Sequence, residues 1–147
     1  MSTQQGQYRY PDGSVYHGQW DSDGRRHGYG SLILSDGSKF RGNFDKGFYS
    51  ELGAIDFTDG SKYEGEFLKG RFHGLGVFVQ SNNMRFEGEF KDGKICGLGI
   101  VSFPNGSHGL PRNEGYFDGM KIVRQEQCPR VIQRARDVAT RVRALNL

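Results

Sequence analysis

The stretch SKYEGEFLKGRFHGLG, from Ser61 to Gly76, is one copy of a motif that recurs along most of this chain. Two aromatic residues flank a glycine, as in Tyr63-Gly65-Phe67, and a turn at Gly70 leads to two more glycines. The central glycines of successive copies lie 23 to 27 residues apart, at Gly18, Gly42, Gly65, Gly88 and Gly115. A period near 23 residues predicts a repeat protein, in which stacked units bury together what one unit cannot.

Each unit is expected to be a β-hairpin. Steps such as Asp59-Gly60 recur between the units, and because Asp, Asn and Gly tolerate positive φ, they predict tight turns. Apolar and polar residues alternate on either side of these turns, which predicts short strands. We therefore predict a mainly β fold: an elongated, twisted, single-layer antiparallel sheet of stacked hairpins, about 45–50 Å long for ten or so strands.

Alternation also assigns residues to the two faces of the sheet. Aromatic residues and glycines share one face, whereas Glu64, Glu66 and their counterparts Glu87 and Glu89 project from the other, which we interpret as a solvated acidic face. We expect the rings to lie over glycines and to pack against one another. Since the sequence shows no second layer, we also interpret them as the floor of a partner groove. The predicted partner-binding residues are Tyr16, Trp20, Phe40, Phe44, Tyr63, Phe67, Phe78, Phe86 and Phe90.

Two departures interrupt the pattern. Glu51 stands where other units have Gly28, Gly74 or Gly97, and we expect its side chain to crowd the aromatic face or to bend the sheet. The tract HGLPRN, residues 108–113, lengthens the last step and predicts a loop or bulge, because proline cannot donate to a strand ladder.

The C-terminal segment has a different character. Residues 1–120 carry a net charge of −2 and residues 121–147 one of +5. We expect a flexible terminus at 1–5, a repeat array at 6–121 of about four full units plus half units, and a basic segment at 122–147. From Pro129 to Leu145 the apolar residues share one arc, which predicts an amphipathic α-helix. The helix either caps the last repeats and protects an edge strand, or lies on a membrane surface. In the second case, anionic phospholipids would be bound by Arg130, Arg134, Arg136, Arg141 and Arg143.

No catalytic constellation, cofactor loop or metal-ligand cluster stands out in the sequence, which favours a non-enzymatic protein without a cofactor. His27 and His73 occupy equivalent positions two units apart, a separation of roughly 19 Å that no shared metal could bridge. The acidic array disfavours nucleic acid. Two unpatterned cysteines and the lack of a signal segment favour a soluble, reduced, cytoplasmic protein, which we expect to be monomeric.

The copies resemble the repeat of the MORN family, whose unit runs approximately YxGxWxxGxxxGxGxxxxxDGxxY. The resemblance covers about Gly6 to Lys121 and implies an elongated sheet of hairpins that binds proteins or, less securely, phospholipids. The tract FPNGSHGLPRNEG (residues 103–115) and the segment CPRVIQRA (128–135) are similar to small members made almost entirely of such repeats. That similarity implies an adaptor that binds the tail of class III myosins, in photoreceptors and actin-rich protrusions.

Overall fold

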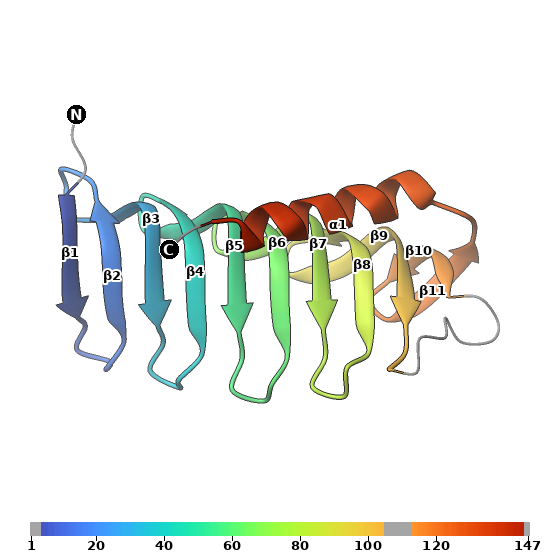
Figure 1. Ribbon diagram of the computed structural model, residues 1–147, viewed down its shortest axis with the longest axis horizontal. Helices are drawn as coiled ribbons and strands as arrows, with labels where there is room; N and C mark the ends of the chain where they lie inside the picture. Colours follow the sequence, from blue (N-terminus) through green and yellow to red (C-terminus); the bar gives the residue numbers. More distant parts are fainter. Residues whose placement is uncertain (1–3, 105–112, 146–147) are drawn as a thin grey trace.

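The computed structural model describes residues 4–104 and 113–145, which form one open antiparallel sheet and one helix (Figure 1). The eleven strands lie side by side in sequence order. They are β1 (Gln4–Arg9), β2 (Val15–Trp20), β3 (Arg26–Ile33), β4 (Lys39–Asp45), β5 (Phe48–Asp56), β6 (Lys62–Leu68), β7 (Arg71–Val79), β8 (Arg85–Lys91), β9 (Lys94–Ser102), β10 (Glu114–Asp118) and β11 (Lys121–Gln125), followed by the helix α1 (Pro129–Arg143). This arrangement confirms the predicted mainly β fold of stacked hairpins with a C-terminal helix.

The boundaries differ a little from those expected. The sheet extends from Gln4 to Gln125, beyond both limits of the expected array at 6–121, and the helix ends at Arg143 rather than Leu145. Of the expected flexible terminus at 1–5, residues 1–3 lie outside the described residues. The expected loop at HGLPRN lies outside them too, apart from Asn113.

The predicted tight turns are held by Asx side chains. Asp59 Oδ1 accepts a hydrogen bond from the Ser61 backbone N–H (2.8 Å), and Asn82 Oδ1 accepts one from that of Met84 (2.9 Å). The Asn82-Asn83 turn thus keeps the geometry of the Asp-Gly turns, with Asn83 at a φ of 70°. At the opposite ends of the strands, the turn glycine of every hairpin after the first donates its N–H to the preceding hairpin. These bonds join Gly47 to Arg26, Gly70 to Tyr49, Gly93 to Phe72 and Gly119 to Ile95.

The core of each unit is an aromatic ring lying over two glycines. The Tyr63 ring covers Gly65 and Gly76, which are paired across β6 and β7, and a Cβ added to Gly76 would lie 2.7 Å from the ring's Cε1 and Cζ atoms. The Tyr63 hydroxyl donates to the Glu66 carbonyl oxygen (2.8 Å), so the polar end of this buried ring is paired. Without side chains at the glycines, the ring packs directly on backbone, as the sequence predicted.

The rings also contact one another from unit to unit. Tyr63 makes edge-to-face contacts with Phe67 in its own unit and with Phe90 in the next, at centroid distances of 5.2 and 4.9 Å. The same geometry links the other units into an unbroken row, in the order Tyr16, Phe44, Phe40, Phe67, Tyr63, Phe90, Phe86 and Phe117. We call this the aromatic row. It is the hydrophobic core of the sheet.

The helix α1 packs on the face of the sheet opposite the aromatic row and crosses β5 to β9 (Figure 1). Ala135, Val138 and Val142 of α1 pack against Ala54 and Leu75 of the sheet. The expected docking of the helix on the repeats is confirmed, but the expectation that it protects an edge strand is wrong, because it forms a partial second layer over β5 to β9. No helix among the described residues is long and apolar enough to cross a membrane.

Strand pairing shifts register beside the central glycine in each of the first four units. On one strand a side-chain oxygen accepts a hydrogen bond from the backbone of the next strand. The pairs are Gln19 with Tyr29 (2.8 Å), Asn43 with Leu52 (3.4 Å), Glu66 with Leu75 (2.6 Å) and Glu89 with Leu98 (2.6 Å). The residue before each donor has a positive φ, and the four are Gly28, Glu51, Gly74 and Gly97.

Glu51 keeps the backbone of its glycine counterparts, with a φ of 54°, and its side chain is exposed. The expected crowding of the aromatic face is therefore wrong. At Gly74 an added Cβ would lie 2.5 Å from Glu66 Oε1, whereas the second unit has the shorter Asn43 at the corresponding position. The departure at Glu51 is thus accommodated by Asn43, and its cost is confined to the left-handed backbone.

Replacing Glu51 with glycine is expected to raise the free energy of unfolding by about 0.5–1 kcal/mol, because glycine adopts this backbone without the Cβ clash but is more flexible when unfolded. The matched change, Gly74→Ala, is expected to destabilise the protein, since its Cβ would meet the Glu66 carboxylate. Urea denaturation of both variants measures the effect. Destabilisation by E51G would show that the Glu51 side chain is itself stabilising.

The buried tyrosines predict a loss of stability in alkali. Burial raises the pKa of Tyr16 to about 12, and it also raises the pKa of Tyr63. Since tyrosine in an unfolded chain ionises near pH 10, the unfolded state loses protons above that pH that the folded state retains, and stability falls as pH rises from about 10 to 12.

Phenylalanine at either position should flatten this decline, as Phe40 and Phe86 already occupy the equivalent sites. Tyr16→Phe also removes the hydrogen bond from the hydroxyl to the Gln19 carbonyl oxygen (2.6 Å), at a cost of about 1 kcal/mol at neutral pH. Urea denaturation at a series of pH values separates the two effects. An unchanged slope above pH 10 in the double phenylalanine variant would contradict the assignment.

Candidate functional site

The predicted partner-binding aromatics are mostly core residues. Seven of the nine are buried: Tyr16, Phe40, Phe44, Tyr63, Phe67, Phe86 and Phe90. Only Trp20 and Phe78 are partly exposed. The interpretation that the rings pack against one another is confirmed, whereas partner binding through them stays a prediction. Any partner on this face would meet a different set of side chains first.

A second set of apolar side chains lies on the aromatic row. Tyr49 stacks on Phe40, with centroids 3.9 Å apart and planes 10° apart, and Phe72 stacks on Tyr63 at 4.0 Å and 16°. Ile95 occupies the same position in the next unit, and all three are partly exposed. We call Tyr49, Phe72 and Ile95 the covering row. They give this face an apolar surface even though the aromatic row is buried.

The sequence analysis missed the covering row, although a signal was present. Each of its members lies two residues after a turn glycine, at Gly47, Gly70 or Gly93. In the first unit this position is Arg26, whose guanidinium lies 5.3 Å from the Tyr10 ring centroid and 5.4 Å from that of Phe44. Because the residue type varies so widely, comparison of the units did not single the position out.

An apolar hollow of about 230 Å³ opens beside the covering row, toward the C-terminal part of the sheet. It is lined chiefly by Phe72, Phe78, Phe90, Ile95 and Met120. Gln80 also borders it, at a position where other units carry Tyr10, Leu34, Phe57 or Phe103. The other units carry an apolar side chain at this position, whereas Gln80 is polar and borders the hollow. The hollow has the shape and lining to take an apolar side chain.

The opposite face is not the solvated acidic face that was predicted. Glu87 is 2% exposed and accepts hydrogen bonds from Arg136 Nε (2.8 Å) and Nη2 (3.1 Å). Glu64 pairs with Arg143 Nε at 3.4 Å, and Glu114 Oε2 accepts a hydrogen bond from the backbone N–H of Cys128, which precedes the helix (2.8 Å). Each of these three glutamates directly precedes the central glycine of its unit. Together they position α1. The prediction failed because alternation identifies a face without showing what covers it.

The five arginines predicted to bind lipid are divided by this docking. Arg136 and Arg143 face the sheet and pair with Glu87 and Glu64. The hydrogen bond to Glu87 raises the pKa of Arg136. All five are exposed, but Arg130, Arg134 and Arg141 have no ion-pair partner among the described residues. The apolar stripe between the two sets is occupied by the sheet and is not available to a membrane.

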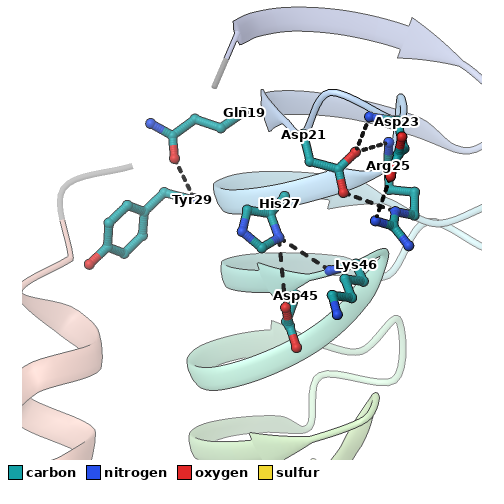
Figure 2. A network of polar contacts seen from close by, with 8 residues as sticks. All are labelled: Gln19, Asp21, Asp23, Arg25, His27, Tyr29, Asp45 and Lys46. Atoms are coloured by element: carbon teal, nitrogen blue, oxygen red, sulfur yellow. Dashed lines mark hydrogen bonds and ion pairs between the residues drawn. The ribbon is translucent and has the colours of Figure 1, made fainter. Parts of the chain in front are cut away.

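The repeat histidines have a structural role. His27 Nδ1 accepts a hydrogen bond from the Lys46 backbone N–H (3.3 Å) and lies 3.7 Å from Asp45 Oδ1, so it ties β3 to the next hairpin turn (Figure 2). His73 makes the same contact with the Asp92 N–H (3.5 Å). Within the part of the chain that the structure describes, no group of three or more His, Cys, Asp or Glu side chains could hold a metal ion.

Neither cysteine is paired. Cys96 is partly exposed, and Cys128 is buried beneath the start of α1. Burial, together with the nearby Glu114 carboxylate, raises the pKa of the Cys128 thiol. Such a thiol is a poor nucleophile at neutral pH. Cys128 is therefore part of the helix packing and gives no support for catalysis.

Comparisons with known proteins agree with this architecture. The sequence model of the MORN repeat matches residues 5–15, 16–39, 63–85 and 86–108. The unmatched stretch between residues 39 and 63 contains Asn43 and Glu51. The chain is also 55% identical, over 139 residues, to the MORN repeat-containing protein 4 homolog of Drosophila melanogaster. The aligned region covers 95% of this chain and 70% of the relative. MORN repeats are associated with protein interaction or with membranes. The chain belongs to the MORN-repeat family.

Proposed function

We propose that this protein is a non-enzymatic adaptor that binds the tail of a class III myosin on the aromatic face of its sheet. The choice of partner is supported by the resemblance of residues 103–115 and 128–135 to retinophilin, a small MORN-repeat protein. By the same resemblance, we propose a cytoplasmic protein enriched in actin-rich protrusions such as those of photoreceptors.

The hollow beside the covering row is the observation that carries the proposal. Phe72, Phe78 and Ile95 present apolar surface there, on a rigid floor formed by the buried aromatic row. A preformed floor loses little side-chain entropy when a partner binds. A single apolar side chain of the myosin tail is expected to anchor in the hollow, with the rest of the segment lying across neighbouring strands.

A role for α1 in membrane binding is the second candidate. It is supported by the three exposed arginines, Arg130, Arg134 and Arg141. With its apolar stripe occupied by the sheet, the helix could contact anionic lipid only through charge, and binding of that kind weakens steeply with added salt. We therefore rank myosin binding first.

The test is a calorimetric titration of the full chain with a class III myosin tail fragment, comparing the wild type with Met120→Glu and Leu68→Glu. Met120 borders the hollow and is 46% exposed, so a carboxylate there should leave the fold intact and weaken binding by about tenfold or more. Leu68, 49% exposed and outside the hollow, provides the matched control and should bind like the wild type.

Equal affinity of the two variants would rule out the hollow as the anchor site, and no binding by the wild type would rule out this partner. A parallel titration with phosphatidylserine-containing vesicles tests the second candidate. Vesicle binding that persists after Arg130, Arg134 and Arg141 are all replaced with glutamine would contradict it.

A further inference from the structure

The helix covers only part of its face of the sheet. With 15 residues, α1 is about 22 Å long and crosses β5 to β9, which span roughly 19 Å. On the same face, β1 to β4 lie beyond its C-terminal end. Figure 2 shows the Tyr29 side chain projecting from β3 toward the side on which the helix lies. Tyr29 is 44% exposed, and Ile33, four residues further along β3 on the same face, is 45% exposed. An uncovered surface with apolar groups therefore continues the line of α1.

The acidic row on this face ends where the helix ends. The residue just before the central glycine is Glu114, Glu87 and Glu64 in the covered units, and Arg41 and then His17 in the uncovered ones. Strand pairing places His17 and Arg41 on either side of Ser31, in the same row across the sheet as Glu64. The three glutamates receive the Cys128 N–H, Arg136 and Arg143 of the basic helix. A basic helix would be repelled by Arg41, the position beyond Glu64 in this row.

The rest of the uncovered surface is also basic. Arg9 and Lys39 lie on the same face as Arg41, and both are exposed. Among the described residues, no carboxylate lies within ion-pair distance of Arg9, Lys39 or Arg41. Asp56 of β5, the cross-strand neighbour of Lys39, is the nearest acidic position in the strand register. We call the surface formed by Arg9, Val15, His17, Tyr29, Ile33, Lys39 and Arg41 the basic patch.

The spacing of the existing contacts defines what could bind there. Arg136 and Arg143 are seven residues apart on α1, which corresponds to about 10.5 Å along a helix. Their partners Glu87 and Glu64 lie two strands apart, or roughly 9.6 Å. One heptad of helix thus matches one hairpin of sheet. The same match extends to Arg41, one hairpin beyond Glu64, and to His17, one hairpin further.

We propose that the basic patch binds an acidic amphipathic helix of a partner protein, which lies end to end with α1. Two of its carboxylates, seven residues apart, face Arg41 and His17, while its apolar side chains cover Tyr29, Ile33 and Val15. The four strands of the patch span about 14 Å, so roughly ten residues of helix fill it. This site is on the opposite face from the proposed myosin groove and is independent of it.

The probe is a synthetic 14-residue peptide, held helical by a side-chain staple, with glutamates at two positions seven apart and leucines on the adjoining stripe. A matched peptide carries lysines in place of the two glutamates. Binding to the isotopically labelled full chain is followed by backbone NMR shifts. The glutamate peptide is expected to shift the signals of Tyr29, Ile33 and Arg41 and to lose affinity with added salt, while the lysine peptide leaves them unchanged.

Arg41→Glu provides the decisive variant, because glutamate is the native residue at the equivalent positions 64 and 87 and is compatible with the fold. This substitution is expected to weaken binding of the glutamate peptide by about tenfold and to allow the lysine peptide to bind. Arg71→Glu, an exposed charge reversal at the start of β7, is the matched control, and Met120→Glu on the opposite face should also leave peptide binding unchanged.

Three results would overturn the proposal. One is equal binding of the two peptides, or binding of the glutamate peptide that R41E does not alter. Another is failure of both peptides while phosphatidylserine vesicles shift the same signals, which would assign the patch to a membrane. The last is a wild-type dimer that R41E dissociates, measured by sedimentation, which would assign the patch to a second copy of this chain.

Discussion

The contact between an aromatic ring and two backbone glycines is the constraint on which this structure depends. A β-sheet ordinarily needs another layer to cover its apolar face. Here the rings of the aromatic row lie flat enough on paired glycines, such as Gly65 and Gly76 under Tyr63, that they form the covering layer themselves. The covering row then seals the rings from the other side. A side chain at either glycine would lift the ring, break its edge-to-face contacts with neighbouring units and expose the core. The period of the sequence is therefore the period of this contact.

Within the constant pattern, the positions that vary between units give each part of the sheet its own properties. The residue before the central glycine is the clearest example, since a glutamate there receives the helix and an arginine does not. One heptad of helix has nearly the same length as one hairpin of sheet. This single position therefore forms a row of charges across the sheet whose spacing matches that of Arg136 and Arg143 along α1. The covering position behaves similarly on the other face, where Arg26, Tyr49, Phe72 and Ile95 give successive units different surfaces over the same core. A regular scaffold with variable positions can bind different partners on its two faces without any change of fold.

The sequence was sufficient to predict the repeat, the hairpins, the turns, the assignment of residues to faces and the amphipathic helix, because each depends on local periodicity. It did not predict where the helix docks. The apolar residues that contact the helix, such as Ala54, Leu75 and Ile100, alternate with glutamates across the strands. From the sequence, we therefore interpreted this face as exposed to solvent. It also led us to treat Phe67 and Phe90 as accessible, since alternation cannot show that Phe72 covers them. The accommodation of Glu51 by Asn43 depends on a register shift between strands, which no pattern along a single strand reveals.

The position of α1 has a consequence for the motions of the sheet. Units in a linear array are held mainly by their neighbours, so an array without other ties opens from its ends. The helix spans β5 to β9 and ties those strands together, whereas β1 to β4 are held by strand pairing, ring contacts and side-chain hydrogen bonds such as that of His27. The amides of β1 to β4 should therefore exchange with solvent through local openings of low free energy, while those under α1 exchange only when the helix detaches or the whole sheet unfolds. We therefore expect the strands under α1 to open more slowly than the four strands at the N-terminal end.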